Sequence, residues 1–76
     1  HHSIQTILFN KHEFTLKQAK DWLKKHGYLY HNYRLETNHR RFQQTPPIIR
    51  GNYYAKKIYP DPNNEHHYIT LILQSY

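Results

Sequence analysis

Short apolar runs predict where this chain forms strands. Residues 4–9 (IQTILF) are mostly apolar or β-branched, which is typical of a strand with both faces at least partly covered. Residues 67–73 (HYITLIL) form the most apolar stretch and are the best candidate for a central strand. Three less apolar segments also have strand character, at residues 28–35, 39–44 and 53–59. The pattern therefore predicts five strands.

One segment carries the start and stop signals of a helix. Thr15 and Gln18 have the spacing of a capping box, in which each side chain satisfies a backbone N–H at the start of a helix. Gly27 can take the left-handed conformation that ends a helix. These signals predict a helix over residues 16–26. Its apolar stripe, with Trp22 as the expected main anchor, consists of Leu16, Ala19, Trp22 and Leu23.

Turn residues separate the later strands. Residues 36–38 (ETN) have turn composition, Pro46 and Pro47 cannot donate to a strand ladder, and residues 60–64 (PDPNN) form the strongest loop signal. The predicted order is β-α-β-β-β-β. One helix cannot bury its apolar stripe alone. We therefore expect an α+β fold, a two-layer sandwich in which the helix packs on a mostly antiparallel sheet.

The same patterns predict the arrangement of the sheet. The two apolar strands, 4–9 and 67–73, should be central and adjacent, and the more polar hairpin 28–44 should lie toward an edge. A chain of 76 residues has room for one small domain, which we place at residues 4–75. Residues 1–3 are interpreted as a tag remnant or a disordered start.

Several function classes lack the residues they need. The chain has no cysteine, and its only serines, Ser3 and Ser75, lie at the two ends. The five acidic residues are scattered, and no His-x₃-His or His-Glu-x-x-His spacing occurs. No run of 18 apolar residues is present, which argues against a membrane span. We therefore expect a non-enzymatic protein with no cofactor, no metal and no membrane partner.

The basic residues carry the strongest functional signal, because the net charge is +6 with eight tyrosines. Basic residues follow one stripe of the helix and recur beside aromatic residues in two strands. Alternation along a strand places one member of each strand pair on the sheet face away from the helix. The candidate nucleic-acid-binding residues are Lys17, Lys20, Lys24, Arg40, Arg41, Lys56, Lys57, Tyr30, Tyr53 and Tyr59.

Two structural interpretations of the same residues remain open. The lysine stripe also suits an ordinary solvated helix face, and the tyrosines also suit a half-buried layer in a thin domain. Tyrosine and arginine are equally enriched at protein interfaces. The alternative function is therefore a protein–protein assembly module, either a minor capsid component or a homodimeric structural component that uses a free sheet edge.

The chain also resembles a short uncharacterised domain of tailed phages and large DNA viruses. The resemblance is carried by Phe9-Asn10-Lys11, by a T-x-x-x-A-x-x-W-L-x-x-H-G helix and by an R-F-x-Q strand, and it covers most of the chain. On this sequence the helix and strand motifs fall on Thr15, Ala19, Trp22, Leu23, His26, Gly27, Arg41, Phe42 and Gln44. The tyrosine-rich residues 28–33 and the DPNNEHH loop depart from the pattern.

The resemblance implies a viral source but assigns no activity to any residue. We therefore expect a small basic viral accessory or virion protein that binds DNA or RNA through a Lys/Arg and Tyr-rich surface. A second copy or another virion protein is the expected protein partner. For a viral protein the expected location is the virion, or the cytoplasm or nucleus of a host cell; for a protein of another source an intracellular location is expected.

Overall fold

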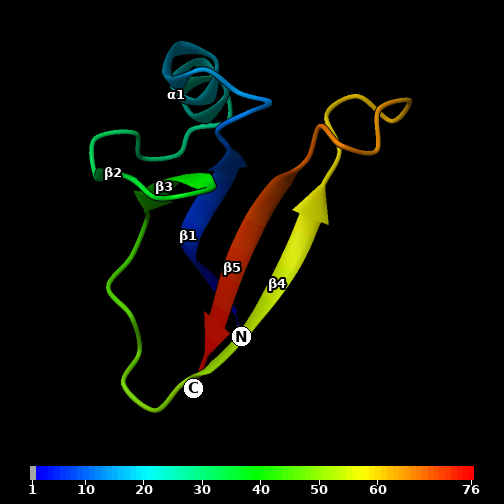
Figure 1. Cartoon of the computed structure of the whole chain (residues 1–76). Helices are drawn as coiled ribbons and strands as arrows, with labels where there is room; N and C mark the ends of the chain where they lie inside the picture. The colour runs from blue at the N-terminus through cyan, green and yellow to red at the C-terminus, as the bar shows by residue number, and fades with distance from the viewer. Residues whose placement is uncertain (1) are drawn as a thin grey trace.

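The chain folds into one antiparallel sheet of five strands with a single helix on one of its faces. The computed structural model describes residues 2–76 (Figure 1). The predicted α+β class and the order β-α-β-β-β-β are both confirmed. The elements are β1 (Ser3–Asn10), α1 (Leu16–Lys25), β2 (Tyr33–Leu35), β3 (His39–Gln43), β4 (Asn52–Ile58) and β5 (Ile69–Ser75).

The strands lie in the order β2-β3-β1-β5-β4, and all neighbouring pairs are antiparallel. β1 and β5 are central and adjacent, as their apolar sequences predict. The β2–β3 hairpin lies at one edge, also as predicted, and β4 forms the other. β5 starts two residues later than expected, because the N–H of His67 still closes a turn to the carbonyl of Asn64 at 3.2 Å.

The predicted capping box fixes the start of α1. The backbone N–H of Gln18 donates to the Thr15 hydroxyl at 3.1 Å, and the Thr15 N–H donates to the Gln18 side-chain oxygen at 2.9 Å. The helix ends at Lys25, with His26 as its cap and Gly27 in the left-handed region at φ 78°. Figure 1 shows α1 at the end of the sheet where β1 finishes and β5 begins.

The predicted strand at 28–35 is wrong over its first five residues, since only Tyr33–Leu35 forms a strand. Tyr28 instead continues from the helix, and its N–H donates to the Leu23 carbonyl at 2.9 Å. The backbone of Leu29 then pairs with a side chain. It donates to Gln44 Oε1 at 2.9 Å and accepts from Gln44 Nε2 at 2.8 Å. A side-chain amide takes the place that a neighbouring strand would occupy.

The core lies between α1 and the sheet and is largely aromatic. The Phe9 side chain is fully buried and makes edge-to-face contacts with three rings, those of Phe14, Trp22 and Phe42, at centroid separations of 5.2, 5.8 and 5.6 Å. The buried cluster consists of Ile7, Phe9, Phe14, Ala19, Leu23, Phe42, Ile69 and Leu71.

Trp22 is not the main anchor of the helix, contrary to the prediction. Ala19 and Leu23 are the buried helix residues, whereas Trp22 is only half-buried. Its ring lies at the rim of the core and stacks on His26 at 4.1 Å and on Tyr28 at 5.8 Å. A helical stripe identifies which face packs, but the position of the helix over the sheet decides which residue is central.

A long connection joins the two halves of the sheet. The chain leaves β3, passes the ends of β1 and β5, and enters β4 at the opposite edge (Figure 1). Gly51 closes this connection next to β5. A Cβ atom at Gly51 would lie 2.9 Å from the carbonyl oxygen of Ser75 and 2.9 Å from the Ile48 side chain.

Candidate nucleic-acid interface

Register across the five strands places three cations on the sheet face away from α1, here called the open face. Arg41 opposes Arg34 on one side and Leu8 on the other, and Thr70 opposes Leu8 and Lys57. Directly opposed residues in antiparallel strands share a face. The result is one cross-strand row, here called the basic row: Arg34, Arg41, Leu8, Thr70 and Lys57.

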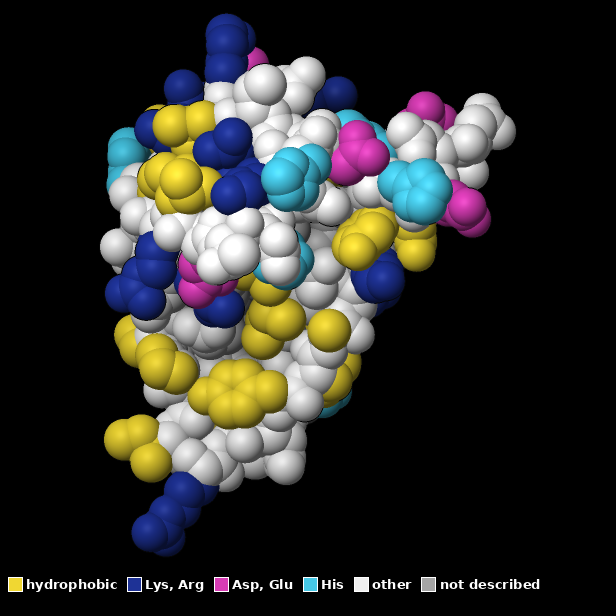
Figure 2. Space-filling model, viewed as in Figure 1, with side chains coloured by type: hydrophobic (Ala, Val, Ile, Leu, Met, Phe, Trp, Pro, Cys, Tyr) yellow, Lys and Arg dark blue, Asp and Glu magenta, His cyan; other side chains and the backbone are white. Residues whose placement is uncertain are grey.

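The prediction that each basic strand pair places one cation on this face is confirmed by the register. Arg41 and Lys57 lie on the open face, and Arg40 and Lys56 lie on the helix side. With neighbouring strands about 4.8 Å apart, the two ends of the basic row are roughly 19 Å apart. In Figure 2, Lys and Arg side chains gather at the left of the view and again near the upper end of β4, with hydrophobic side chains between them.

At the β2–β3 end, two arginines are direct cross-strand neighbours. Arg34 is exposed, and Arg41 forms an ion pair with Glu36, with Arg41 Nε 3.1 Å from Glu36 Oε1. Both side chains of that pair are about one-third exposed, at 35% and 33%. Glu36 therefore relieves the repulsion between the arginines and leaves one positive charge in excess.

A polar hollow of about 410 Å³ opens beside this end of the basic row. It brings together side chains from β1, β2 and β3 and from the residues that flank β2. Guanidinium, amide and hydroxyl groups dominate its wall, so it offers hydrogen-bond donors and acceptors to a polar ligand. The lining residues are Gln5, Thr6, Asn32, Tyr33, Arg34, Glu36, Arg41 and Gln43.

At the β4 end, lysine and tyrosine side chains meet. Lys57 Nζ lies 4.3 Å from the ring centroid of Tyr68, and Tyr59 contacts the same ring at 5.9 Å. Tyr59 follows the last residue of β4 rather than lying within a strand as predicted. Tyr53 also lies on the open face of β4, two cross-strand rows from Lys57. Its hydroxyl donates to the Ile48 carbonyl at 2.7 Å. Its side chain is 46% exposed.

The lysine stripe of α1 belongs to the other layer and does not join the basic row. Lys17 is paired with Asp21, with 2.7 Å between Nζ and Oδ2. Their hydrogen bond lowers the pKa of the Asp21 carboxyl and raises the pKa of Lys17. Lys24 lies 4.8 Å from the ring centroid of Tyr30, and Lys20 is half-exposed. Tyr30 is thus placed beside the helix and not on the open face.

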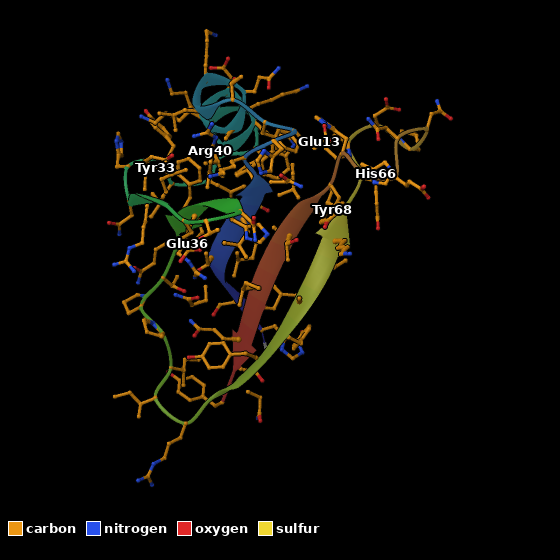
Figure 3. All side chains as sticks on the ribbon, viewed as in Figure 1. Glu13, Tyr33, Glu36, Arg40, His66 and Tyr68 are labelled. Atoms are coloured by element: carbon orange, nitrogen blue, oxygen red, sulfur yellow. The ribbon has the colours of Figure 1, made fainter. Side chains whose placement is uncertain are left out.

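The Arg40 side chain is held by hydrogen bonds to two other residues of the domain. Its Nε donates to the Phe14 carbonyl at 2.9 Å, and its Nη1 donates to the Tyr33 hydroxyl at 3.0 Å. Figure 3 shows Arg40 and Tyr33 close together beneath α1, with Glu36 farther along the hairpin. The structure therefore places Arg40 between the helix start and β2, where two of its five N–H donors are already used.

We expect Arg40→Gln to lower the free energy of unfolding by about 1–3 kcal/mol, because a charged donor to two partly buried acceptors is lost. Oligonucleotide affinity of the folded variant should stay unchanged. Urea titration and fluorescence anisotropy measure the two effects. The exposed Arg34→Gln should change stability by less than about 0.5 kcal/mol. Unaltered stability with weaker oligonucleotide binding in Arg40→Gln would contradict the assignment.

Arg34 is the residue that sequence reasoning missed. It stands alone in the sequence YRLE, without a second cation beside it. The signal that identifies it is the hairpin register, which sets Arg34 opposite Arg41. Glu36 was also missed as a partner of Arg41, because it lies in the predicted turn.

Within residues 2–76, no group of three or more His, Asp or Glu side chains is placed to hold a metal ion. No helix in the described part of the chain has the length and apolar character to cross a membrane. No family model, curated protein or solved structure matches the chain.

Proposed function

We propose that this chain is a small basic nucleic-acid-binding protein, without enzymatic activity, that binds single-stranded DNA or RNA across the open face of its sheet. The observation that carries the proposal is the basic row, which sets Arg34 and Arg41 at one edge and Lys57 at the other. A viral accessory or virion role is part of the proposal and is supported by the phage and large-virus resemblance of the helix and strand motifs.

The open face offers the two kinds of contact that a single strand needs. Cations at both ends of the row suit phosphates, whose binding supplies most of the affinity in such complexes. Ile72, Ala55 and Tyr53 lie below them and present apolar and aromatic surface, whereas Leu8 in the middle of the row is buried. Bases stack on such surface with little sequence preference. The hollow beside Arg41 adds polar groups at one end of the path.

The acidic residues leave most of this face to the cations. Glu13 precedes the helix and Asp21 lies on it, paired with Lys17. Asp61 and Glu65 lie in the loop that projects beyond β4 and β5 (Figure 1). Glu36 alone among the five acids is ion-paired with a cation of the basic row. A polyanion approaching the open face therefore meets a net positive surface.

The direct test is a fluorescence anisotropy titration of a labelled single-stranded oligonucleotide. Three phosphate contacts give a slope of about −2 for log affinity against log salt, so affinity should fall about 20-fold between about 50 and 200 mM salt. Matched DNA and RNA strands separate the two ligands, and a duplex of the same sequence should bind more weakly. Absence of binding at the lower salt concentration would refute the proposal.

Two charge-matched variants localise the site. Arg34→Gln with Lys57→Gln removes two cations from the basic row, and Lys20→Gln with Lys24→Gln removes two from the helix. We expect the first to weaken binding about tenfold and to lower the salt slope by about 1.4. The helix variant should change affinity less than about threefold. Equal losses in both variants would mean diffuse attraction to the whole molecule.

A further inference from the structure

β4 is an outer strand with an unusually free edge. It is seven residues long and pairs with β5 on one side only. Its residues are exposed along the strand, apart from the half-buried Ile58. The opposite edge of the sheet is β2, which is only three residues long. Figure 1 shows β4 as a long outer strand beside β5, at one edge of the sheet. Long exposed edges pair readily with another strand, and short edges do not.

We propose that β4 pairs with β4 of a second copy of this chain, antiparallel and with Ala55 opposite Ala55. The sequence of β4 is NYYAKKI, and it is complementary to itself when reversed. In this register Tyr54 opposes Lys56 of the second copy, and Tyr53 opposes Lys57. The two ends pair Asn52 with Ile58. Each lysine faces a tyrosine and no lysine faces a lysine.

The register follows from the length and the charge of the strand. Ala55 is the midpoint of Asn52–Ile58, so only this register pairs the whole strand when the open faces of the two copies stay on the same side. If the two-fold axis passed through Lys56 instead of Ala55, Lys56 would lie directly opposite Lys56 of the second copy. Like charges in that position are destabilising. If the axis passed through Tyr54, the hydrogen-bonded ladder between the two copies would be shorter and Lys57 would lie opposite Gly51.

The tyrosine–lysine pairs repeat a contact that each copy already makes. Lys57 lies over Tyr68 at 4.3 Å, and Lys24 lies over Tyr30 at 4.8 Å. Lysines on an edge strand ordinarily discourage pairing. Here the register converts both lysines into partners for aromatic rings. Edge pairing leaves the two faces of the sheet uncovered, so the dimer is compatible with the proposed ligand surface but does not depend on it.

A single cysteine tests the register directly, because the chain contains no cysteine. Opposed Cα atoms in an antiparallel pair lie about 4.5–5.5 Å apart, which a disulfide can bridge. Under a glutathione redox buffer, Ala55→Cys should form a covalent dimer at least about tenfold faster than Ile49→Cys. Ile49 is 89% exposed and lies outside β4. Equal rates for the two variants would overturn the proposed register.

A swap variant tests the pairing without a cross-link. Sedimentation equilibrium of the unmodified chain should show a concentration-dependent dimer. Tyr54→Lys should weaken it about tenfold, because the two-fold symmetry repeats each lysine–lysine opposition. Adding Lys56→Tyr to the same chain should restore dimerisation to within about threefold of the unmodified chain, because tyrosine again faces lysine. Both side chains are exposed on the helix side of β4.

Each result of this series decides the proposal. A monomer at all concentrations, an unchanged dimer in Tyr54→Lys, or no recovery in the double variant would overturn it. Far-ultraviolet circular dichroism and urea titration confirm that each variant is folded. The nucleic-acid proposal is measured separately, since Tyr54 and Lys56 lie on the sheet face opposite the basic row.

Discussion

Phe9→Ala is expected to lower the free energy of unfolding by about 3–5 kcal/mol, the usual cost of removing a buried phenylalanine. Phe9 is fully buried at the centre of the sheet and contacts rings from the helix, from the turn before it and from β3. Ring contacts of this kind add to the free energy that comes from burial alone. Urea titration followed by tryptophan fluorescence reports the loss, because Trp22 lies 5.8 Å from Phe9.

The size of the domain makes this loss large. A chain of 76 residues has a total stability of about 4–11 kcal/mol, so the substitution removes much of it. Phe9→Leu keeps most of the apolar volume and should cost about 1–2 kcal/mol. Ile49→Ala alters a side chain that is 89% exposed and should change stability by less than about 0.5 kcal/mol. A cost below about 1 kcal/mol for Phe9→Ala would contradict the position of this core.

Local signals in the sequence predicted the fold where chemistry acts over a few residues. Thr15, Gln18 and Gly27 set the limits of the helix because capping and left-handed backbone are properties of neighbouring atoms. The strand prediction failed at residues 28–32 because the Gln44 amide, 15 residues from Leu29, satisfies the Leu29 backbone. No periodicity in one segment contains that information.

In the candidate site, too, the sequence predicted what depends on neighbouring residues and missed what depends on distant ones. Alternation along a strand predicted that one member of each basic pair lies on the open face, though not which member, because side-chain direction has a period of two residues. It did not reveal that Arg40 is held by Phe14 and Tyr33, which are distant in the sequence. The basic row as a whole depends on the register of four strand pairs. Register arises from packing and turn geometry together, so the row became visible only in the assembled sheet.

Gln74→Ala is expected to lower the free energy of unfolding by about 2–3 kcal/mol and to loosen the connection between β3 and β4. Gln74 is only 2% exposed and is the polar anchor of that connection. Its Oε1 accepts from the Ile48 N–H at 2.8 Å. Its Nε2 donates to the Thr45 hydroxyl and to the Pro46 carbonyl, both at 3.0 Å. Truncation removes all three bonds from partly buried groups, and each unpaired group costs free energy.

Hydrogen exchange at Ile48 distinguishes this mechanism from a general loss of packing. In Gln74→Ala the Ile48 amide should exchange faster than the amides of β1, because its acceptor is gone while the central ladder remains. Thr45→Val removes a shared partner, so the double variant should cost about 0.5–1.5 kcal/mol less than the two single changes added together. Asn63→Ala, in the exposed loop, is the control and should leave stability and Ile48 exchange unchanged. If the costs of Gln74→Ala and Thr45→Val were strictly additive, the two side chains would stabilise the connection between β3 and β4 independently of each other.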